Sequence, residues 1–282
     1  MKKFIIILGV CGTALSAIFV RYSTTPSTVL VFYRMLFSVL LLSPMFVIGH
    51  AEEIKKITLG LAGKCILSGI FLGIHFVCYF MSLSYTSVAS SVVLVDTEIF
   101  FVALGSFILF HEYISVKGWM CILITFIGSV IVTMGDVGQS NVLGDILALC
   151  GAICSAVYTL IGRQCRNSIS TSVYTWFVYF SAGITVLFAT LFSKESIIQI
   201  DQRNILVALE LAIFCTLLGH SIFSWGLRYE KASFISMAKL LEPIFASILA
   251  VAIFKEIPSQ FSVIGGLFVI AGIMSYIKYT KE

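Results

Sequence analysis

The stretch VASSVVLVDTEIFFVALGSFILF, from Val88 to Phe110, has the length of a membrane-spanning helix and carries two acidic residues near its middle. At a rise of about 1.5 Å per residue, a helix needs roughly 20 apolar residues to cross a bilayer. A charge near the bilayer centre costs about 2.5–3.5 kcal/mol on insertion scales, so such residues usually face a cavity or a partner. Asp96 and Glu98 therefore indicate a polar interior within a membrane-embedded protein.

The composition of the whole chain also indicates a membrane protein. Of the 282 residues, 59% are hydrophobic and 11% are charged, and the mean hydropathy is +1.06. Soluble domains are about 45–50% apolar and about 25% charged. The apolar segments are continuous and lack the period-two alternation of β-barrel strands, so an all-α membrane protein is predicted. The eight cysteines lie mostly inside these segments and are interpreted as packing residues.

Ten apolar segments separated by polar breaks are predicted to be transmembrane helices. They cover approximately residues 4–20, 29–49, 62–83, 88–110, 117–135, 143–162, 172–192, 205–228, 233–254 and 261–279. More spans follow the first segment, so it is interpreted as a retained helix and not as a cleaved signal peptide. With the N-terminus inside, the inner loops and termini hold twelve of the eighteen Lys and Arg residues. Cytoplasmic loops carry an excess of these residues, which predicts cytoplasmic termini.

An internal repeat relates the two halves of the chain. Identical residues recur 144 positions apart at Leu83 and Leu227, Tyr85 and Tyr229, Glu98 and Glu242, Glu112 and Glu256, and Gly128 and Gly272. Each half holds five predicted helices, an odd number, so the halves are expected to insert with opposite orientations. Inverted repeats are typical of secondary transporters with a site near the membrane midplane. We therefore predict two inverted five-helix repeats, residues 1–138 and 139–282, around a central cavity.

Three groups of residues resemble the EamA-type repeat of the drug/metabolite transporter superfamily. They are AKLLEPIFASILA (238–250) with FKE (254–256) and the glycines at 265, 266 and 272, the segment GDILALCGAICSAVY (144–158), and FYR (32–34). The resemblance covers essentially the whole chain. It implies ten helices, a central cavity and, mostly, export of amino acids or related small metabolites. Ile99 stands where the second half has Pro243, so whether residues 88–110 bend like residues 233–254 is left open.

The candidates for substrate or proton binding are ionisable and aromatic residues within the predicted helices. Glu98 and Glu242 lie about ten residues into their helices, near the midplane, and are related by the repeat. They are expected to bind a substrate ammonium group or to exchange protons, or else to be hydrogen-bonded groups at helix bends. The other candidates are Asp96, Lys239, Arg34, His75, His220, Tyr79 and Trp176.

The basic candidates have two predicted roles. Asp96 is about 200° from Glu98 around a helix, so it is expected to pair with Arg34 or Lys239 on a neighbouring helix. Arg34 or Lys239 is also expected to bind a substrate carboxylate. Alternatively, Arg34 extends to the outer interface, or Lys239 pairs with Glu242 three residues on.

The remaining candidates each have a structural alternative. His75 and His220 are interpreted as proton carriers or as polar packing residues. Tyr79 and Trp176 are expected to line a cavity for flat or amphipathic substrates, or else to pack or face lipid. Glu210 is interpreted as a residue at the rim of its helix.

Together these features predict a secondary transporter, an exporter, of the plasma membrane. It would move a small amino acid, amine or related metabolite by alternating access, either coupled to protons or by facilitated diffusion, and the excess of buried acids favours protons. The first alternative is a channel or scaffold. An intramembrane enzyme is disfavoured because the chain lacks HExxH and GxSG motifs. No cofactor, metal or nucleic-acid partner is predicted.

Overall fold

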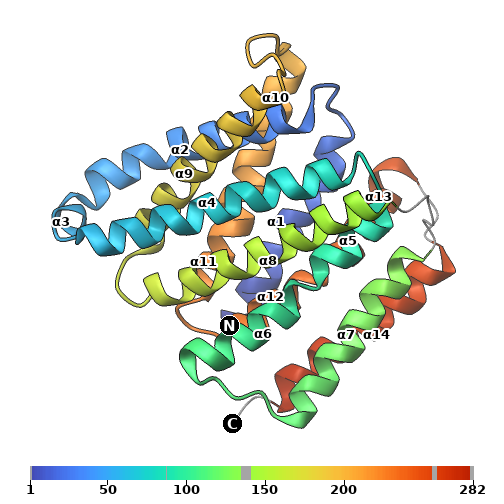
Figure 1. The fold of residues 1–282 in the computed structure, drawn as a ribbon. Coiled ribbons are helices and arrows are strands. Elements are labelled where there is room, and N and C mark those ends of the chain that lie inside the picture. The colour runs from blue at the N-terminus through green and yellow to red at the C-terminus, as the bar shows by residue number, and fades with distance from the viewer. Residues whose placement is uncertain (1, 87, 135–140, 256–258, 280–282) are drawn as a thin grey trace.

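The computed structural model describes residues 2–86, 88–134, 141–255 and 259–279, and these ranges form a bundle of helices (Figure 1). The helices are α1 (Lys2–Val20), α2 (Ser27–Gly49), α3 (Ala51–Lys55), α4 (Leu59–Ser82), α5 (Val88–Asp96), α6 (Glu98–Phe110), α7 (Val116–Thr133), α8 (Val142–Cys165), α9 (Thr171–Phe192), α10 (Gln202–Glu210), the π-helix η1 (Leu211–His220), α11 (Ser221–Gly226), α12 (Ala232–Lys239), α13 (Glu242–Phe254) and α14 (Gln260–Tyr279).

The helices agree with the predicted membrane spans. Within the described ranges, nine helical stretches are long and apolar enough to cross a membrane, and a tenth apolar helix, Val116–Val132, is shorter. Each of the ten overlaps one predicted segment. The prediction of an all-helical membrane fold is therefore confirmed, and α3 is an additional short helix in the loop between α2 and α4.

Two of the spans are broken near their middle. The span of α5 and α6 is interrupted at Thr97, and that of α12 and α13 at Leu240 and Leu241. Pro243 lies at the start of α13, where the absence of a backbone N–H is tolerated. In the first half the Thr97 hydroxyl donates to the carbonyl of Leu94. The first-half span therefore breaks without a proline.

The boundaries of these elements follow the 144-residue offset of the sequence repeat. Helix α12 begins 144 positions after α5, and both ends of α13 lie 144 positions after those of α6. The residues that follow α6 and α13, His111 and Lys255, are both left-handed, with φ of 54° and 60°. The local structure of the two halves thus corresponds. The division at residue 138 and the opposite orientation of the halves stay predictions.

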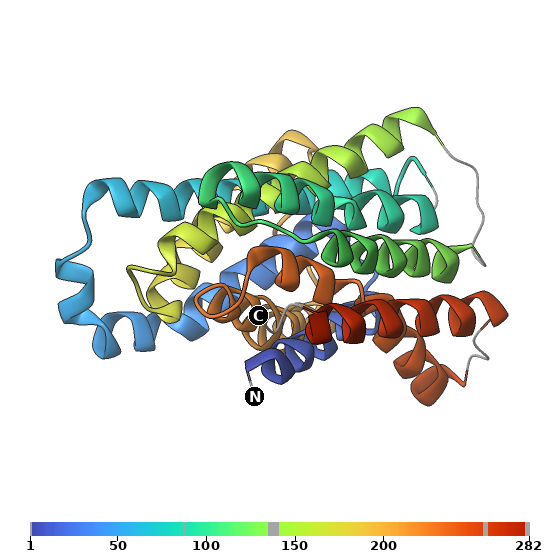
Figure 2. The ribbon, with the colours of Figure 1, turned by 90° about the horizontal axis from the view of Figure 1, so that it is seen from below.

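Helices of one half pack against helices of the other. Helix α4 packs on α8 and α9, and the stretch from α10 to α11 packs on α1 and α2. Helices α7 and α14 run alongside each other (Figure 2). A Cβ atom at Gly265 would lie 2.5 Å from the carbonyl oxygen of Gly128, so glycine is needed for this close approach. The two halves therefore interlock into one bundle.

Both ends of the described chain lie at the same end of the bundle, which we call the terminal end (Figure 1). Lys3 of α1 pairs with Glu230 at 3.9 Å, and the Lys117 ammonium lies 5.3 Å from the ring centre of Tyr279. At the other end, which we call the distal end, Asn204 accepts a hydrogen bond from the Ser23 hydroxyl at 2.8 Å. These contacts define which loops share a face of the membrane.

A buried arginine stabilises the terminal end. Arg166 is 2% exposed and donates to the Ser224 carbonyl at 3.0 Å, to the Thr171 hydroxyl at 2.7 Å and to the Ile169 carbonyl. Burial and the nearby positive charge of Arg228 lower the pKa of Arg166 to about 10, so it stays charged at neutral pH. The loop between α8 and α9 is thereby joined to α11.

Gly69 and Gly73 give α4 a flat face against α9, as their spacing predicts. A Cβ atom at Gly69 would meet the Val178 carbonyl oxygen and lie 2.8 Å from Val178 Cα, while one at Gly73 would lie 3.0 Å from the Ala182 carbonyl oxygen. By contrast, a Cβ atom at Gly63, in the same helix, has nothing within 4 Å. The first turns of α4 thus tolerate a side chain that its middle does not.

We expect Gly69→Ala to lower the free energy of unfolding by about 1–3 kcal/mol, because the added methyl group overpacks a backbone contact. Gly63→Ala is the matched control and is expected to leave stability unchanged or to raise it by up to about 1 kcal/mol, through the higher helix propensity of alanine. Thermal unfolding of the purified variants in detergent measures both effects. Equal melting temperatures for the two variants would contradict the close packing of α4 on α9.

Candidate substrate-binding cavity

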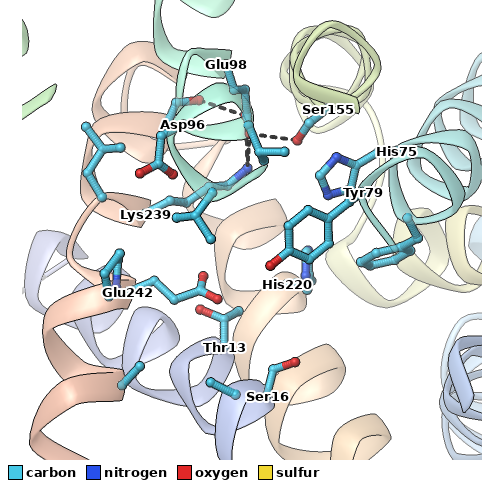
Figure 3. A pocket seen from close by; sticks show the side chains of 18 of the residues that line it. Thr13, Ser16, His75, Tyr79, Asp96, Glu98, Ser155, His220, Lys239 and Glu242 are labelled. Carbon is cyan, nitrogen blue, oxygen red and sulfur yellow. Dashed lines mark hydrogen bonds and ion pairs between the residues drawn. The ribbon is translucent and has the colours of Figure 1, made fainter. Parts of the chain in front are cut away.

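A cavity of about 420 Å³ lies within the bundle (Figure 3). Its wall is formed by residues of α1, α2, α4, α5, α6, α8, η1, α11, α12 and α13, together with Val132 of α7 and Ser262 of α14. Val132 lies in the last turn of α7 and Ser262 in the first turn of α14, both at the distal end. The cavity therefore extends from the middle of the helices toward the distal end.

Glu98 joins three helices at the inner end of this cavity. It is 6% exposed and its carboxylate accepts hydrogen bonds from the Lys239 ammonium at 2.9 and 3.2 Å. The Ser155 hydroxyl also donates to this carboxylate at 2.7 Å (Figure 3), and the hydroxyls of Thr159 and Ser236 do so at 3.1 Å each. Glu98 is the first residue of α6, where the helix dipole favours a negative charge. Helices α6, α8 and α12 are thus connected through one carboxylate.

Asp96 has a different partner from the one predicted. Its carboxylate accepts a hydrogen bond from the Ser129 hydroxyl of α7, while the ion pair of Lys239 is with Glu98. The predicted pairing of Asp96 with Arg34 or Lys239 is wrong, because the break at Thr97 places Asp96 and Glu98 in separate helices. The two side chains therefore do not keep the angular separation that a continuous helix would give them.

Glu242, the repeat counterpart of Glu98, has a much sparser environment. It is half-buried at the start of α13, and its carboxylate lies beside the Thr13 hydroxyl of α1 (Figure 3). Among the described residues, no Lys, Arg or His nitrogen lies within 4 Å of it. The alternative pairing with Lys239 is wrong, since α12 ends at Lys239 and that side chain binds Glu98. The two equivalent acids thus differ in their partners.

Arg34 points into the protein and not toward the membrane interface. It is 3% exposed, its Nε donates to the Thr216 hydroxyl at 2.7 Å, and its guanidinium lies 5.0 Å from the ring centre of Phe76. This burial excludes the alternative in which Arg34 extends to the outer interface. In the described part of the chain, no carboxylate oxygen lies within 4 Å of its guanidinium.

Both predicted histidines and Tyr79 line the cavity. His75 Nδ1 lies 3.0 Å from the Gly151 carbonyl oxygen, and its ring is parallel to that of Tyr79. His220, the last residue of η1, contacts the ring of Phe76 edge to face. Its Nδ1 is buried and has no hydrogen-bond partner among the described residues. His75 thus has a hydrogen-bond partner in a neighbouring helix, whereas Nδ1 of His220 has none among the described residues.

One aromatic candidate, Trp176, and one acidic residue, Glu210, lie away from the described cavity wall. Trp176 stacks on Phe46 with ring centres 4.2 Å apart and donates to the Ser43 hydroxyl at 3.0 Å, and the described cavity wall does not include it. Glu210 ends α10 and is likewise absent from the described wall. In the described part of the chain, the wall carries three acids, Asp96, Glu98 and Glu242, and two basic residues, Arg34 and Lys239, besides the histidines.

The π-helix η1 was not predicted from the sequence. The Thr216 hydroxyl donates to the Leu211 carbonyl at 3.3 Å, five residues back, as the wider turn of a π-helix allows. The Tyr179 hydroxyl donates to the Thr216 carbonyl at 3.3 Å. A Cβ atom at Gly219 would lie 2.6 Å from Thr13 Cγ2, so η1 approaches α1 closely. Long π-helices are rare and often occur at functional sites.

The hydroxyl groups around the charged residues were also missed. Thr13, Ser236 and Thr216 contribute to the cavity wall or hold its charged groups. Serine and threonine are common in membrane helices, so nothing in the sequence separates these positions from other hydroxyl residues.

Arg163 connects three segments at the terminal end. Arg163 of α8 pairs with Glu112, which follows α6, at 3.1 Å, and it also donates to the carbonyl of Leu227 after α11. The repeat counterpart of Glu112, Glu256, lies outside the described residues. The terminal end is thus held by contacts of α8 with the segments that follow α6 and α11, while the cavity extends toward the distal end.

Comparisons with known proteins agree with this architecture. The sequence profile of the EamA-like transporter family matches residues 2–134 and 142–277. The chain is 25% identical over 221 residues to an "Uncharacterized transporter" of Archaeoglobus fulgidus, covering 77% of this chain and 74% of that protein. It is 24% identical over 276 residues to the "Uncharacterized transporter YxxF" of Bacillus subtilis, covering 96% and 86%.

A solved crystal structure shares the fold, with a TM-score of 0.80 over 100% of this chain and 98% of that chain at 18% identity. Because the family profile covers both halves of the chain almost completely, the protein belongs to the EamA-like transporter family.

Proposed function

We propose that the protein is a secondary transporter that moves amino acids, amines or related small metabolites across the plasma membrane by alternating access. The observation that carries this proposal is a charged cavity within a membrane bundle, which extends toward the distal end while ion pairs hold the terminal end. Membership of a transporter family supports it. Charged residues buried in a membrane usually mark a substrate or ion pathway.

The distribution of Lys and Arg supports cytoplasmic termini. In that orientation the distal end faces the outside, and the structure corresponds to an outward-facing state. Export then requires a second state in which the contacts of Arg163 with Glu112 and Leu227 open and the distal end closes. The breaks at Thr97 and at Leu240 and Leu241 are suited to such a change, because each lets half of a span move separately.

The acids of the cavity support proton coupling. Among the described residues of the wall, three carboxyl groups face Arg34 and Lys239, and Lys239 is already paired with Glu98. Glu242, which has no ion-pair partner among the described residues, is the acid available to a substrate ammonium or a proton in this state. Glu98 becomes available only when its contact with Lys239 opens. His75, His220 and Tyr79 complete the proposed polar wall.

Counterflow in proteoliposomes, across a panel of amino acids, amines and nucleosides, tests the proposal. We expect saturable exchange of at least one amino acid or amine, and we expect Glu98→Gln to reduce that exchange or to remove its pH dependence. Ion flux without saturable solute exchange would instead identify a channel. Exchange that is confined to nucleosides would contradict the proposed substrate class.

A further inference from the structure

Arg34 is a buried cation whose binding capacity is mostly unused. A guanidinium group is always charged and has five N–H donors. Only Nε has an acceptor among the described residues, the Thr216 hydroxyl at 2.7 Å, so both terminal nitrogens lack a protein partner. A buried charge is costly unless it is paired and hydrogen-bonded. Because Arg34 lines the cavity, a solute in the cavity is placed to supply the missing anion.

A second unused nitrogen lies close to Arg34. The Phe76 ring centre is 5.0 Å from the Arg34 guanidinium and 5.7 Å from the ring centre of His220, so both groups border the same aromatic ring. Nδ1 of His220 is buried without a partner in the described part of the chain. His220 is also on the cavity wall. Two donor-capable groups of the cavity wall thus border one aromatic ring, and among the described residues the terminal nitrogens of Arg34 and Nδ1 of His220 have no acceptor.

The π-helix positions this pair of groups. Thr216 and His220 are four residues apart in η1, so one segment holds Arg34 through a hydroxyl and supplies the histidine. The Thr216 carbonyl is itself bound by the hydroxyls of Tyr179 and Ser221, each at 3.3 Å. Side chains locked by such surrounding hydrogen bonds give a preorganised site.

The other charged groups of the cavity leave Arg34 as the cation that can bind an anion. Lys239 is paired with Glu98, and His75 is bound to the Gly151 carbonyl. Asp96 is bound by Ser129, and Glu242 lies beside Thr13 (Figure 3), with no ion pair to Arg34 within 4 Å among the described residues. Because the wall already has more acids than bases, a monoanion fits it better than a phosphate dianion does.

We infer that Arg34 and His220 form a carboxylate-binding subsite, and that the transported solute therefore carries a carboxylate group. The inference rests on the proposed transport function and narrows its substrate class, because simple amines lack this group. The two terminal nitrogens of Arg34 match the two oxygens of a carboxylate. A rotation of the His220 ring that brings its buried, unpartnered Nδ1 to the cavity, with the proton on that nitrogen, adds a third hydrogen bond.

Counterflow with matched solute pairs tests the subsite. Each pair is an amino acid and its decarboxylated amine, such as leucine with 3-methylbutylamine and phenylalanine with phenethylamine. For the wild type we expect the exchanged amino acid to exceed its amine by about tenfold or more, because a site built to bind a polar group strongly rejects the analogue without it. Arg34→Gln is expected to reduce the amino acid rate to about the amine rate.

Three further variants separate recognition from folding. Arg34→Lys keeps the charge but loses the two-nitrogen fork, so it should retain part of the discrimination. His220→Gln is expected to reduce the discrimination less than Arg34→Gln does. Lys194→Gln removes an exposed cation outside the cavity and should leave the ratio unchanged. Equal wild-type rates for amino acid and amine would overturn the inference, and so would equal slowing of both by Arg34→Gln.

Binding of a carboxylate to the subsite can be measured without transport, through its effect on the melting temperature. If no solute of the panel exchanges, the proposed function fails, and butyrate then serves as the probe for the carboxylate subsite. Butyrate should raise the melting temperature of the purified wild type above that in equal chloride, and Arg34→Gln should lose this shift. A shift of equal size in both proteins, or no shift in the wild type, would overturn the inference.

Discussion

Lys239→Met is expected to lower the free energy of unfolding by about 3–5 kcal/mol, the cost of leaving a buried charge without its partner. Glu98 has only hydroxyl donors left once the ammonium group is removed. Methionine keeps most of the length and apolar surface of lysine, so packing changes little. Thermal unfolding of the purified protein in detergent measures the loss.

The double variant Glu98→Gln with Lys239→Met is the control for this effect. It removes both charges, so no isolated carboxylate remains, and we expect it to recover most of the stability that Lys239→Met loses. Lys194→Met, at an exposed position, should unfold like the wild type. A Lys239→Met protein with the melting temperature of the wild type would show that the ion pair does not stabilise this state.

Glu242→Gln is expected to abolish exchange, or its pH dependence, while leaving the melting temperature close to that of the wild type. The carboxylate has no ion-pair partner among the described residues, so its loss breaks no protein contact between charges. Glutamine keeps the shape but cannot carry the negative charge that we propose for binding an ammonium group or a proton. Counterflow over a range of pH measures the effect on exchange, and thermal unfolding measures the effect on stability.

Glu210→Gln is the matched control for Glu242→Gln. Glu210 is also a half-buried glutamate in a membrane span, but the described cavity wall does not include it. We expect this variant to exchange solute at the wild-type rate with the wild-type pH profile. Equal losses in both variants would mean that any buried acid affects exchange, and wild-type exchange by Glu242→Gln would exclude its proposed role.

The helices could be predicted because the hydropathy and the length of each apolar segment determine them. A span of roughly 20 apolar residues has few alternatives to a membrane helix, since its backbone groups must be satisfied internally. The repeat was visible because Glu98 and Glu242 are rare residues in such segments. The offset between them reappears in the boundaries of α6 and α13.

The partners of the charged residues could not be predicted in the same way. The apolar pattern predicts one continuous helix that includes Asp96 and Glu98, and the break at Thr97 changes which neighbours each can reach. The π-helix has no signal in the periodicity of apolar residues, yet it places Thr216 beside Arg34. Trp176 belongs to an aromatic stack with Phe46, which only the packing of α2 on α9 reveals. Side-chain partners depend on helix rotation, which hydropathy does not determine.

The claim that solute passes through the central cavity is tested most directly by blocking the cavity. Ala246 of α13 lines the cavity, whereas Ala252 of the same helix is exposed on the outside of the bundle. Counterflow should be lost in Ala246→Trp and retained in Ala252→Trp, with both proteins purified as monodisperse, cooperatively unfolding material. Wild-type exchange by Ala246→Trp would contradict a transport path through this cavity.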